Sequence, residues 1–434
     1  MQYEKSMQYE KSVWKKVAII LVGCVYSFTI LSSTARGGED FLSIYWNRPI
    51  PPQNHKIKFY PYPQECGQCH KNQYKDWKES FHNKAVSPGL LGQINHEKDP
   101  DFAQSCYFCH APMAEQSEVK NQWSVVSGQI EDLKSKTENR KSEIVQNPSF
   151  DNRLKLSGVS CVVCHLREGK IYGPPAKSPP PYPSPASGEG KREGGQKAHN
   201  GFIEKDFFEK AEFCAACHQL DEGYELNGKV LVNTYREWEE SIYSKNNTTC
   251  QKCHMPDRQH LWRGIHDKEM VKRGISIEAA SYKKGARLII KNTGAGHFFP
   301  TYITPLVVVK GFMLDENGKA IPSSVKKAFI GRKVSLDLSK EIFDTRIPPE
   351  KSFEFDYNPP IPLGTDLKSV PTLKGKGGFR GKLVFEVQVY PDEFYNRFYK
   401  DLLKNKDGSF NRKEIEKALK ITERSGYILF KEVL

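Results

Sequence analysis

The sequence predicts an α+β fold in which a mainly helical and loop-rich domain is followed by an antiparallel β-sandwich-like domain and a short C-terminal helix. Three observations predict it. Five Cys-x-x-Cys-His motifs occur in the first part of the chain, and no cysteine follows Cys253. Short apolar runs separated by turn residues begin near residue 274, and a helical pattern begins at Asp392. We therefore assign residues 64–273 to a motif-bearing domain, residues 274–391 to a β-rich domain and residues 392–434 to a helical tail.

The N-terminal segment, residues 1–35, predicts export. Two lysines precede an apolar run over residues 17–31, which is short for a membrane-spanning helix and suits the core of a signal peptide. The small residues at positions 33–35 fit a cleavage site, so a cleaved signal peptide and a retained membrane anchor both stay open. A lipoprotein-like box that ends at Cys24 is a third interpretation, and all three share export.

The motif-bearing domain has a lead-in and an insertion that carry no motif. Residues 36–63 are rich in Pro and aromatic residues and predict an extended lead-in. Helical stretches are expected at residues 72–86 and 124–144. Residues 173–196 are a low-complexity run of Pro, Gly, Ser and Lys without a periodic apolar face, which predicts a disordered surface insertion.

The β-rich domain is predicted from apolar runs bounded by turns. The expected strands have the sequences ISIEAAS, ARLIIKN, PLVVVKGFML, KVSLDL, SFEFDYN and GKLVFEVQVY. Several short strands at such spacing favour an antiparallel sandwich or barrel. In the tail, residues 392–419 show a helical pattern, and residues 427–433 predict a last strand.

Ten of the eleven cysteines belong to the five motifs. The cysteine pairs are Cys66 and Cys69, Cys106 and Cys109, Cys161 and Cys164, Cys214 and Cys217, and Cys250 and Cys253, and the histidines that follow them are His70, His110, His165, His218 and His254. From a single helical turn, this spacing lets both thiols form thioethers with the two vinyl groups of one haem. The histidine then lies under the ring, where its imidazole can bind the iron.

Two other chemistries use paired cysteines, and neither explains this set. Zinc sites would use the cysteine pairs in twos and would leave one of the five pairs over. A redox dithiol has no use for a histidine after every motif. The sequence therefore predicts five covalently bound haem c groups, around which the helical and loop-rich domain stacks. No catalytic residue is assigned.

Seven of the twelve histidines lie outside the motifs and could supply the second axial ligand of each iron. Those that we predict as distal ligands are His82, His199, His260, His266 and His297. His260 and His266 do not share a helix face, so we expect them to serve different irons. His297 stands at the start of the β-rich domain, from which it could join the two domains by reaching a haem. His55 and His96 are weaker candidates for distal ligands.

The formal net charge is +13. A basic balance can indicate binding to nucleic acid or to acidic membranes, but no nucleic-acid motif is present and we expect no such partner. The ionised propionates of haem are anionic. Many of the Lys and Arg side chains therefore have a simpler role in balancing the charge of the cofactors.

Three segments of the chain resemble the multihaem cytochrome superfamily of hydroxylamine oxidoreductase and its tetrahaem electron acceptor. They are CGQCHKNQYKDWKESFHNKA, CQKCHMPDRQHLWRGIHD and NTGAGHFFPT, and the resemblance covers roughly residues 64–310. It implies that haems pack in close parallel or perpendicular pairs and that His82 serves a haem other than the one beside it in sequence. The fifth motif, the β-rich domain, the insertion at residues 173–196 and a second insertion at residues 362–381 depart from the small tetrahaem carrier.

Two main functions follow from this composition. The first is an electron carrier, periplasmic, membrane-anchored or extracellular, in which every iron has two histidine ligands and electrons pass to other cytochromes or to a membrane quinol-oxidising complex. The second is an enzyme with one open iron that acts on a small nitrogen compound such as nitrite or hydroxylamine. A homo-oligomer or filament of extracellular cytochrome subunits would be compatible with the first.

The cofactor assignment predicts a countable result. Protein made in a host competent in cytochrome c maturation should retain five haems per chain after denaturation, because thioether bonds are covalent. Replacing Cys250 and Cys253 together by Ser should leave four. Intact mass and the pyridine haemochrome spectrum measure both numbers, and a colourless wild-type chain would contradict the assignment.

Overall fold

The computed structural model describes parts of both domains and most of the tail. The described residues are 62–93, 106–107, 109–118, 147–167, 170–175, 202–220, 224–282, 285–358, 382–405, 408 and 410–434. Several predicted segments lie outside them: residues 1–35, nearly all of the lead-in at 36–63, the helical stretch at 124–144, and the insertion at 173–196 beyond Pro175.

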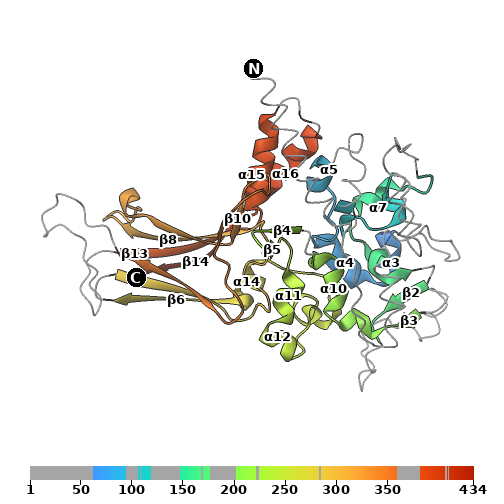
Figure 1. Cartoon of the computed structure of the whole chain (residues 1–434), viewed down its shortest axis with the longest axis horizontal. Coiled ribbons are helices and arrows are strands. Elements are labelled where there is room, and N and C mark those ends of the chain that lie inside the picture. Colours follow the sequence, from blue (N-terminus) through green and yellow to red (C-terminus); the bar gives the residue numbers. More distant parts are fainter. Residues whose placement is uncertain are drawn as a thin grey trace, which may run out of the picture.

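The motif-bearing domain consists of short helices joined by loops, with two small sheets (Figure 1). Its helices are α3 (Pro63–Cys69), α4 (Lys71–Glu79), α5 (Gly89–Gln93), η2 (Ala114–Gln116), α7 (Asn152–Leu156), α8 (Cys161–His165), η4 (Asp206–Glu209), α10 (Glu212–His218), α11 (Thr234–Glu239), α12 (Ile242–Lys245), α13 (Cys250–His254), η6 (Pro256–Arg258) and α14 (Lys268–Gly274). Its strands are β1 (Leu166–Arg167), β2 (Lys170–Gly173), β3 (Phe202–Glu204), β4 (Glu225–Leu226) and β5 (Lys229–Val230). The first three form one sheet, and β4 and β5 form a hairpin.

The buried apolar side chains of this domain form small, separate clusters. One contains Met113, Leu154, Val162, Val163 and Leu166, a second contains Tyr172, Phe208 and Ala216, and a third contains Val86, Tyr107 and Ala111. A domain that folds on its own side chains usually has one continuous core. The described part of this domain therefore fits a fold whose interior is completed by large apolar groups other than its own residues.

The β-rich domain contains two antiparallel sheets that form separate layers (Figure 1). Its elements are β6 (Ile275–Tyr282), β7 (Gly285–Asn292), β8 (Leu306–Leu314), η7 (Pro322–Ser324), β9 (Lys326–Ile330), β10 (Arg332–Val334), β11 (Glu341–Asp344), β12 (Ser352–Tyr357) and β13 (Lys382–Tyr390). One layer has the strand order β12-β7-β6, and the other has the order β14-β13-β8-β9, in which β14 (Tyr427–Val433) comes from the tail. The pair β10 and β11 forms a separate ribbon.

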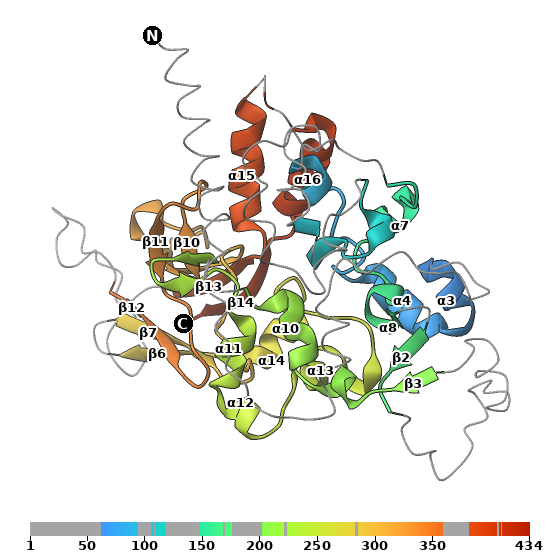
Figure 2. The same cartoon turned by 45° about the vertical axis from the view of Figure 1, so that its right-hand side comes forward.

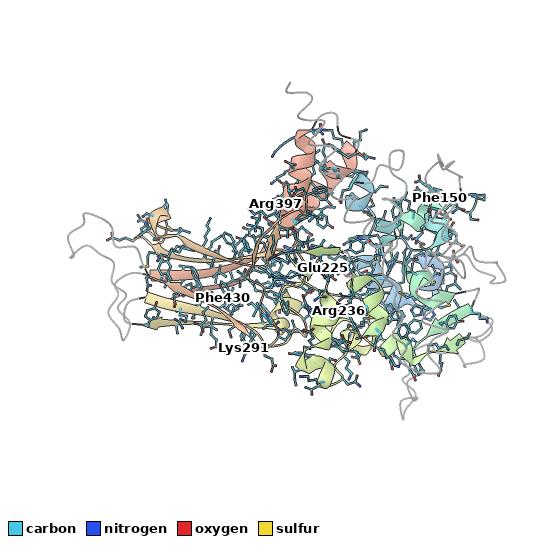
Figure 3. The ribbon with its side chains drawn as sticks, in the orientation of Figure 1. Phe150, Glu225, Arg236, Lys291, Arg397 and Phe430 are labelled. Atoms are coloured by element: carbon cyan, nitrogen blue, oxygen red, sulfur yellow. The ribbon has the colours of Figure 1, made fainter. Side chains whose placement is uncertain are left out.

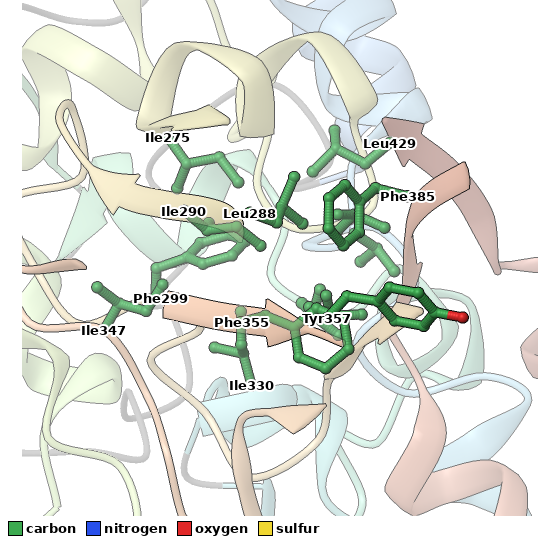
Figure 4. Close-up of a cluster of buried hydrophobic side chains, with 14 of the residues drawn as sticks. Ile275, Leu288, Ile290, Phe299, Ile330, Ile347, Phe355, Tyr357, Phe385 and Leu429 are labelled. Atoms are coloured by element: carbon green, nitrogen blue, oxygen red, sulfur yellow. The ribbon is translucent and has the colours of Figure 1, made fainter. Parts of the chain in front are cut away.

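The two layers share one hydrophobic core, which Figure 4 shows in close-up. In β7, the buried residues Ala286, Leu288 and Ile290 alternate with more exposed ones, as a strand with one face on a core requires. Tyr357 of the same sheet lies against Phe385 of the other sheet, with ring centroids 6.3 Å apart in an edge-to-face arrangement. Large aromatic side chains from both layers therefore fill the space between them.

The tail differs from the single helix expected at residues 392–419. It forms two helices, α15 (Glu393–Lys404) and α16 (Arg412–Arg424), before β14 pairs with β13. The second helix begins where the Asn411 side chain accepts a hydrogen bond from the Glu414 backbone, a capping interaction that ends the preceding loop. Ile415 packs closely on Gly92 of α5. The tail therefore contacts the motif-bearing domain and also completes a sheet of the β-rich domain (Figures 1 and 2).

A buried arginine fastens the β4–β5 hairpin to the β-rich domain. Arg332 is 1% exposed, and its guanidinium donates hydrogen bonds to the carbonyl oxygens of Leu226, Lys229 and Val230. Its charge is balanced by Glu341, whose carboxylate lies 2.8 Å from Arg332 Nε. Buried charges need such partners. The hairpin, which carries Glu225, thus lies at the junction of the two domains (Figure 3).

All six expected strand sequences overlap strands of the structure, and the chain is α+β. Strands β9 and β11 were missed, and the run KVSLDL leaves the strand after Val334 because it enters a turn in which Leu338 has a φ of 53°. Among the described residues, the helices are too short or too polar to cross a membrane.

The shared core predicts a large effect of truncation. Leu288→Ala should destabilise the β-rich domain by about 2–5 kcal/mol, because it removes methyl groups from a fully buried position and leaves a cavity. Thermal unfolding of the haem-loaded protein, followed by far-ultraviolet circular dichroism, measures this. Lys291→Ala, an exposed change on the same strand, is the control, and equal effects of the two changes would contradict the shared core.

Candidate haem-binding sites

The motifs lie on short helical turns, as their chemistry requires. The first pair of cysteines ends α3, and the other described motifs lie within α8, α10 and α13. The second motif is described except for residue 108, and its described residues are helical. In a helix, positions i, i+3 and i+4 share one face, so both cysteines and the histidine of a motif face the same side.

The motif histidines use one ring nitrogen to bind the protein. Nδ1 of His110 lies 2.6 Å from the Ala85 carbonyl oxygen, and Nδ1 of His165 lies 2.8 Å from that of Tyr172. His254 Nδ1 lies 2.6 Å from a backbone carbonyl oxygen in the same way. A metal-bound histidine usually donates its other N–H group to such an acceptor, which fixes the ring and its tautomer. These contacts leave Nε2 as the nitrogen to bind iron.

Three motif histidines face a histidine from elsewhere in the chain. The pairs are His82 with His218 at 6.3 Å, His165 with His260 at 6.2 Å, and His254 with His297 at 6.3 Å between ring centroids. A metal–imidazole bond is about 2.0 Å long and the ring centroid lies roughly 1.1 Å behind the nitrogen, so two imidazoles on one metal have centroids about 6 Å apart. The spacing of all three pairs fits two axial ligands on one iron.

The partners in each pair come from distant parts of the sequence. His82 follows α4, yet it faces the histidine of the fourth motif. His260 follows η6 and faces the third motif. His297 lies in the loop between β7 and β8 and faces the fifth motif. An iron bound between such a pair would cross-link two segments, and at His297 it would join the two domains.

Five of the six imidazoles in these pairs are held in the neutral form. Burial lowers the pKa of His82 to about 3, and it lowers the pKa values of His218 and His297 to about 4. Burial also lowers the pKa values of His110, His254 and His260. The neutral imidazole is the form that binds a metal. At neutral pH these side chains are therefore ready to act as ligands.

Cysteines of different motifs lie next to one another. The Cys66 thiol is hydrogen-bonded to the Cys161 thiol, a contact that lowers the pKa of Cys66 and raises that of Cys161. The Cys214 and Cys250 thiols are paired in the same way, with opposite shifts of their pKa values. Cys164 is also close enough to Cys214 to raise its pKa. The attachment points of the first, third, fourth and fifth motifs thus follow one another through the domain.

Two predicted distal ligands are not placed opposite a motif histidine. His199 lies outside the described residues. His266 Nε2 lies 3.0 Å from Asp392 Oδ2, and its ring lies 4.1 Å from that of Phe81. The role of both as ligands stays a prediction, and the Nε2 atom of His266 has a carboxylate partner in this structure.

Some residues at these sites were not predicted from the sequence. Trp262 contacts both His82 and His260, with ring centroids 4.5 and 5.1 Å away. Trp262 stands between two predicted ligands in the segment HLWRGIH, and this position in the sequence could have indicated its contact with a site. Tyr302 lies 2.5 Å from His218 Nδ1 through its hydroxyl oxygen. In the sequence, only its position five residues after His297 could have indicated that Tyr302 lies near a site.

The donor set fits haem c, which supplies one-electron iron chemistry when bound. Each described motif presents thiols and an imidazole on one face, and three imidazoles have a second imidazole at the spacing of one iron. Phe81, beside His82, is an apolar ring that is 51% exposed although it contacts the His266 ring, and a large apolar group such as a porphyrin could cover it further. The class of protein that this geometry defines is a multihaem c-type cytochrome.

Comparisons with known proteins support this class. The family model of cytochrome c554 and c-prime matches residues 65–131. The crystal structure of a penta-heme cytochrome c552 from Thermochromatium tepidum has a similar fold, with a TM-score of 0.51 and 16% sequence identity over 86% of this chain and 98% of that chain. No curated protein matches the sequence. The finer resemblance to the superfamily of hydroxylamine oxidoreductase stays a prediction.

The pairing of His82 with His218 predicts a specific spectroscopic change. His82→Ala should convert one low-spin ferric haem to high spin and create one site that binds carbon monoxide when reduced, because it removes one axial ligand. Electron paramagnetic resonance and carbon monoxide difference spectra measure this. Asn83→Ala, at the next residue, is the control. Retention of a fully low-spin spectrum in His82→Ala would contradict the pairing.

Proposed function

We propose that the chain is an extracytoplasmic pentahaem c-type cytochrome that passes electrons between bis-histidine haems and redox partner proteins. The observation that carries this proposal is the set of three histidine pairs spaced for one iron each. Two strong axial ligands hold an iron six-coordinate in both oxidation states. Such a site exchanges an electron but leaves no position for a substrate.

The placement of the cysteines supports transfer along the chain of sites. Because each cysteine sulfur would be bonded directly to the edge of its haem, sulfurs that lie side by side would bring two haem edges close together. Contacts between thiols occur between the first and third motifs and between the fourth and fifth motifs. The closeness of Cys164 and Cys214 connects these two groups. The cysteines therefore favour a continuous path for electrons.

The second motif lies beside this path. His110 is close enough to His82 and His218 to lower the pKa of each. Its site is therefore next to that of the fourth motif. The path could enter or leave the domain there, as well as at the first or fifth motif.

The cellular location and the partners are inferred from the sequence. Haem c is attached outside the cytoplasm, and residues 1–35 have the features of an export signal or anchor. The partners that this location offers are other cytochromes or a membrane quinol-oxidising complex. The net charge of +13 before haem attachment would be reduced by the haem propionates, and the basic balance that remains suits partners with acidic docking faces.

A second candidate function, redox catalysis on a small nitrogen compound, is favoured by the surroundings of the second motif. No histidine ring faces His110 among the described residues, and His266 is bonded to Asp392. Burial, with smaller effects of Cys106 and Asp392, raises the pKa of Tyr395, which places its hydroxyl near both. A histidine–aspartate pair and a tyrosine can serve as acid–base groups. This candidate requires that His266 keep its bond to Asp392.

Carbon monoxide separates the two functions. We expect the reduced wild-type protein to form no carbon monoxide complex, because a relay has two ligands on every iron. Its ferric spectrum should be entirely low-spin. One carbon monoxide complex per chain, together with turnover of nitrite or hydroxylamine that Asp392→Asn slows at least tenfold, would favour the enzyme instead. Lys400→Ala, an exposed change on the same helix, is the control.

A further inference from the structure

The histidine of the fourth motif has a different hydrogen-bond partner from those of the second, third and fifth motifs. Those three contact backbone carbonyl oxygens through Nδ1. His218 Nδ1 instead contacts the Tyr302 hydroxyl at 2.5 Å. A histidine whose Nε2 binds iron keeps its proton on Nδ1. His218 therefore donates, and the tyrosine oxygen accepts.

From Tyr302, polar contacts continue to a buried carboxylate. The Thr234 side chain lies beside the Tyr302 hydroxyl, and Tyr302 directly follows Thr301 in the chain. Thr234 Oγ1 lies 3.0 Å from Thr301 Oγ1, and Thr301 Oγ1 donates to Glu237 Oε2 at 2.6 Å. Because Thr301 donates its proton to the carboxylate, Thr234 is the donor in its contact with Thr301. The result is a series of polar contacts that leads from the fourth motif to one acidic group.

Glu237 is held firmly at the end of this chain. It is 4% exposed, and its Oε1 atom lies 2.9 Å from Arg346 Nη1. Arg346 also pairs with Asp344, at 2.9 Å between Nε and Oδ1. The cost of burying a carboxylate is large unless such partners compensate it. The position of Glu237 is therefore fixed by the junction between the two domains.

The same carboxylate also holds the distal ligand of the next site. Glu237 Oε2 accepts a hydrogen bond from the Phe298 backbone N–H at 3.0 Å. Phe298 follows His297, and the carbonyl oxygen of His297 is held by Asn292 Nδ2 at 2.9 Å. His297 faces the histidine of the fifth motif. One carboxylate thus touches the supports of two neighbouring iron sites.

A chain of this kind acts on the iron through the imidazole. Hydrogen bonds in a chain polarise one another, so a carboxylate at the end makes the first acceptor stronger. A stronger acceptor at Nδ1 makes the imidazole a more basic ligand. A more basic ligand, together with the nearby negative charge, stabilises ferric over ferrous iron and lowers the reduction potential.

We propose that Glu237 is a positioning residue that lowers the reduction potential of the haem attached at Cys214 and Cys217, acting through Thr301, Thr234 and Tyr302. It also orients His297 at the haem of the fifth motif. The inference rests on the proposed function, because it assumes that both sites hold haem. Through Glu237, the junction with the β-rich domain helps to set the order of the haem reduction potentials along the path of the electrons.

The test is a spectroscopic redox titration of the full, haem-loaded chain. Glu237→Gln keeps the shape of the side chain and removes its charge, and it should favour reduction of one haem about tenfold, a rise of about 59 mV for a one-electron couple. Thr301→Val breaks the chain without changing the charge and should raise the same potential by less. Tyr302→Phe removes the acceptor itself and should also raise it.

The controls change matched groups that lie off the chain. Glu341→Gln removes a carboxylate from the same group of ion pairs, but that carboxylate contacts Arg332 and Lys229. Tyr243→Phe removes a tyrosine hydroxyl that donates to the Thr293 carbonyl, at the start of the β7–β8 loop and outside the series of contacts from His218 to Glu237. Each should leave all five potentials within a threefold change in the reduction equilibrium.

The affected haem is identified in the His82→Ala background. That change marks the haem of His218 by a high-spin signal, and Glu237→Gln should shift the potential at which this signal disappears. No shift, or an equal shift in Glu341→Gln, with five haems retained would overturn the inference. Failure of the proposed function would give a different result from failure of this inference. The wild-type protein would then hold fewer than five haems or would bind carbon monoxide.

Discussion

The spacing of paired imidazoles is the constraint on which the motif-bearing domain depends. Two rings whose centroids lie 6.2–6.3 Å apart leave room for one metal atom between them, and three such pairs each join segments that are far apart in sequence. The domain has only small apolar clusters of its own among the described residues. Iron–imidazole bonds and contacts with porphyrin faces would therefore stabilise this domain in the way that a continuous hydrophobic core stabilises other domains. This explains why short helices joined by loops suffice to build the described part of the domain.

The β-rich domain has the opposite character, and its rigidity serves the iron sites. Its two sheets share a continuous core of aliphatic and aromatic side chains. The loop between β7 and β8 leaves this core with His297 and Tyr302, which contact the sites of the fifth and fourth motifs. Buried ion pairs of Arg332 and Arg346 fix the junction from which the loop extends. A histidine ligand on a loop keeps a fixed position only when the residues that support it are themselves fixed. Here the supporting residues are buried and charged on both sides of the junction.

The iron sites are not equivalent, although their motifs look alike. Backbone carbonyl oxygens hold three of the motif histidines, whereas a tyrosine holds the fourth, and the second has no facing histidine ring among the described residues. The motif histidines differ in the group bonded to Nδ1 and in the residue on the distal face. A protein can use such differences to give chemically identical cofactors different reduction potentials. If the motifs hold haem, as we propose, these differences would give the protein a means to direct electrons from one haem to the next.

The sequence by itself determined the cofactor, because thioether attachment needs two cysteines and a histidine at fixed local spacing, and such spacing is visible in a few residues. It also determined most strands of the β-rich domain and the last strand of the tail, whose alternation of apolar and polar residues is equally local, and it pointed to His82, His260 and His297. Only the tertiary structure decided which of these faces which motif, placed Nε2 of His266 on Asp392, divided the helical part of the tail into two helices, and connected His218 to Glu237. Those relations depend on segments that meet only after folding, where distance along the chain carries no information about distance in space.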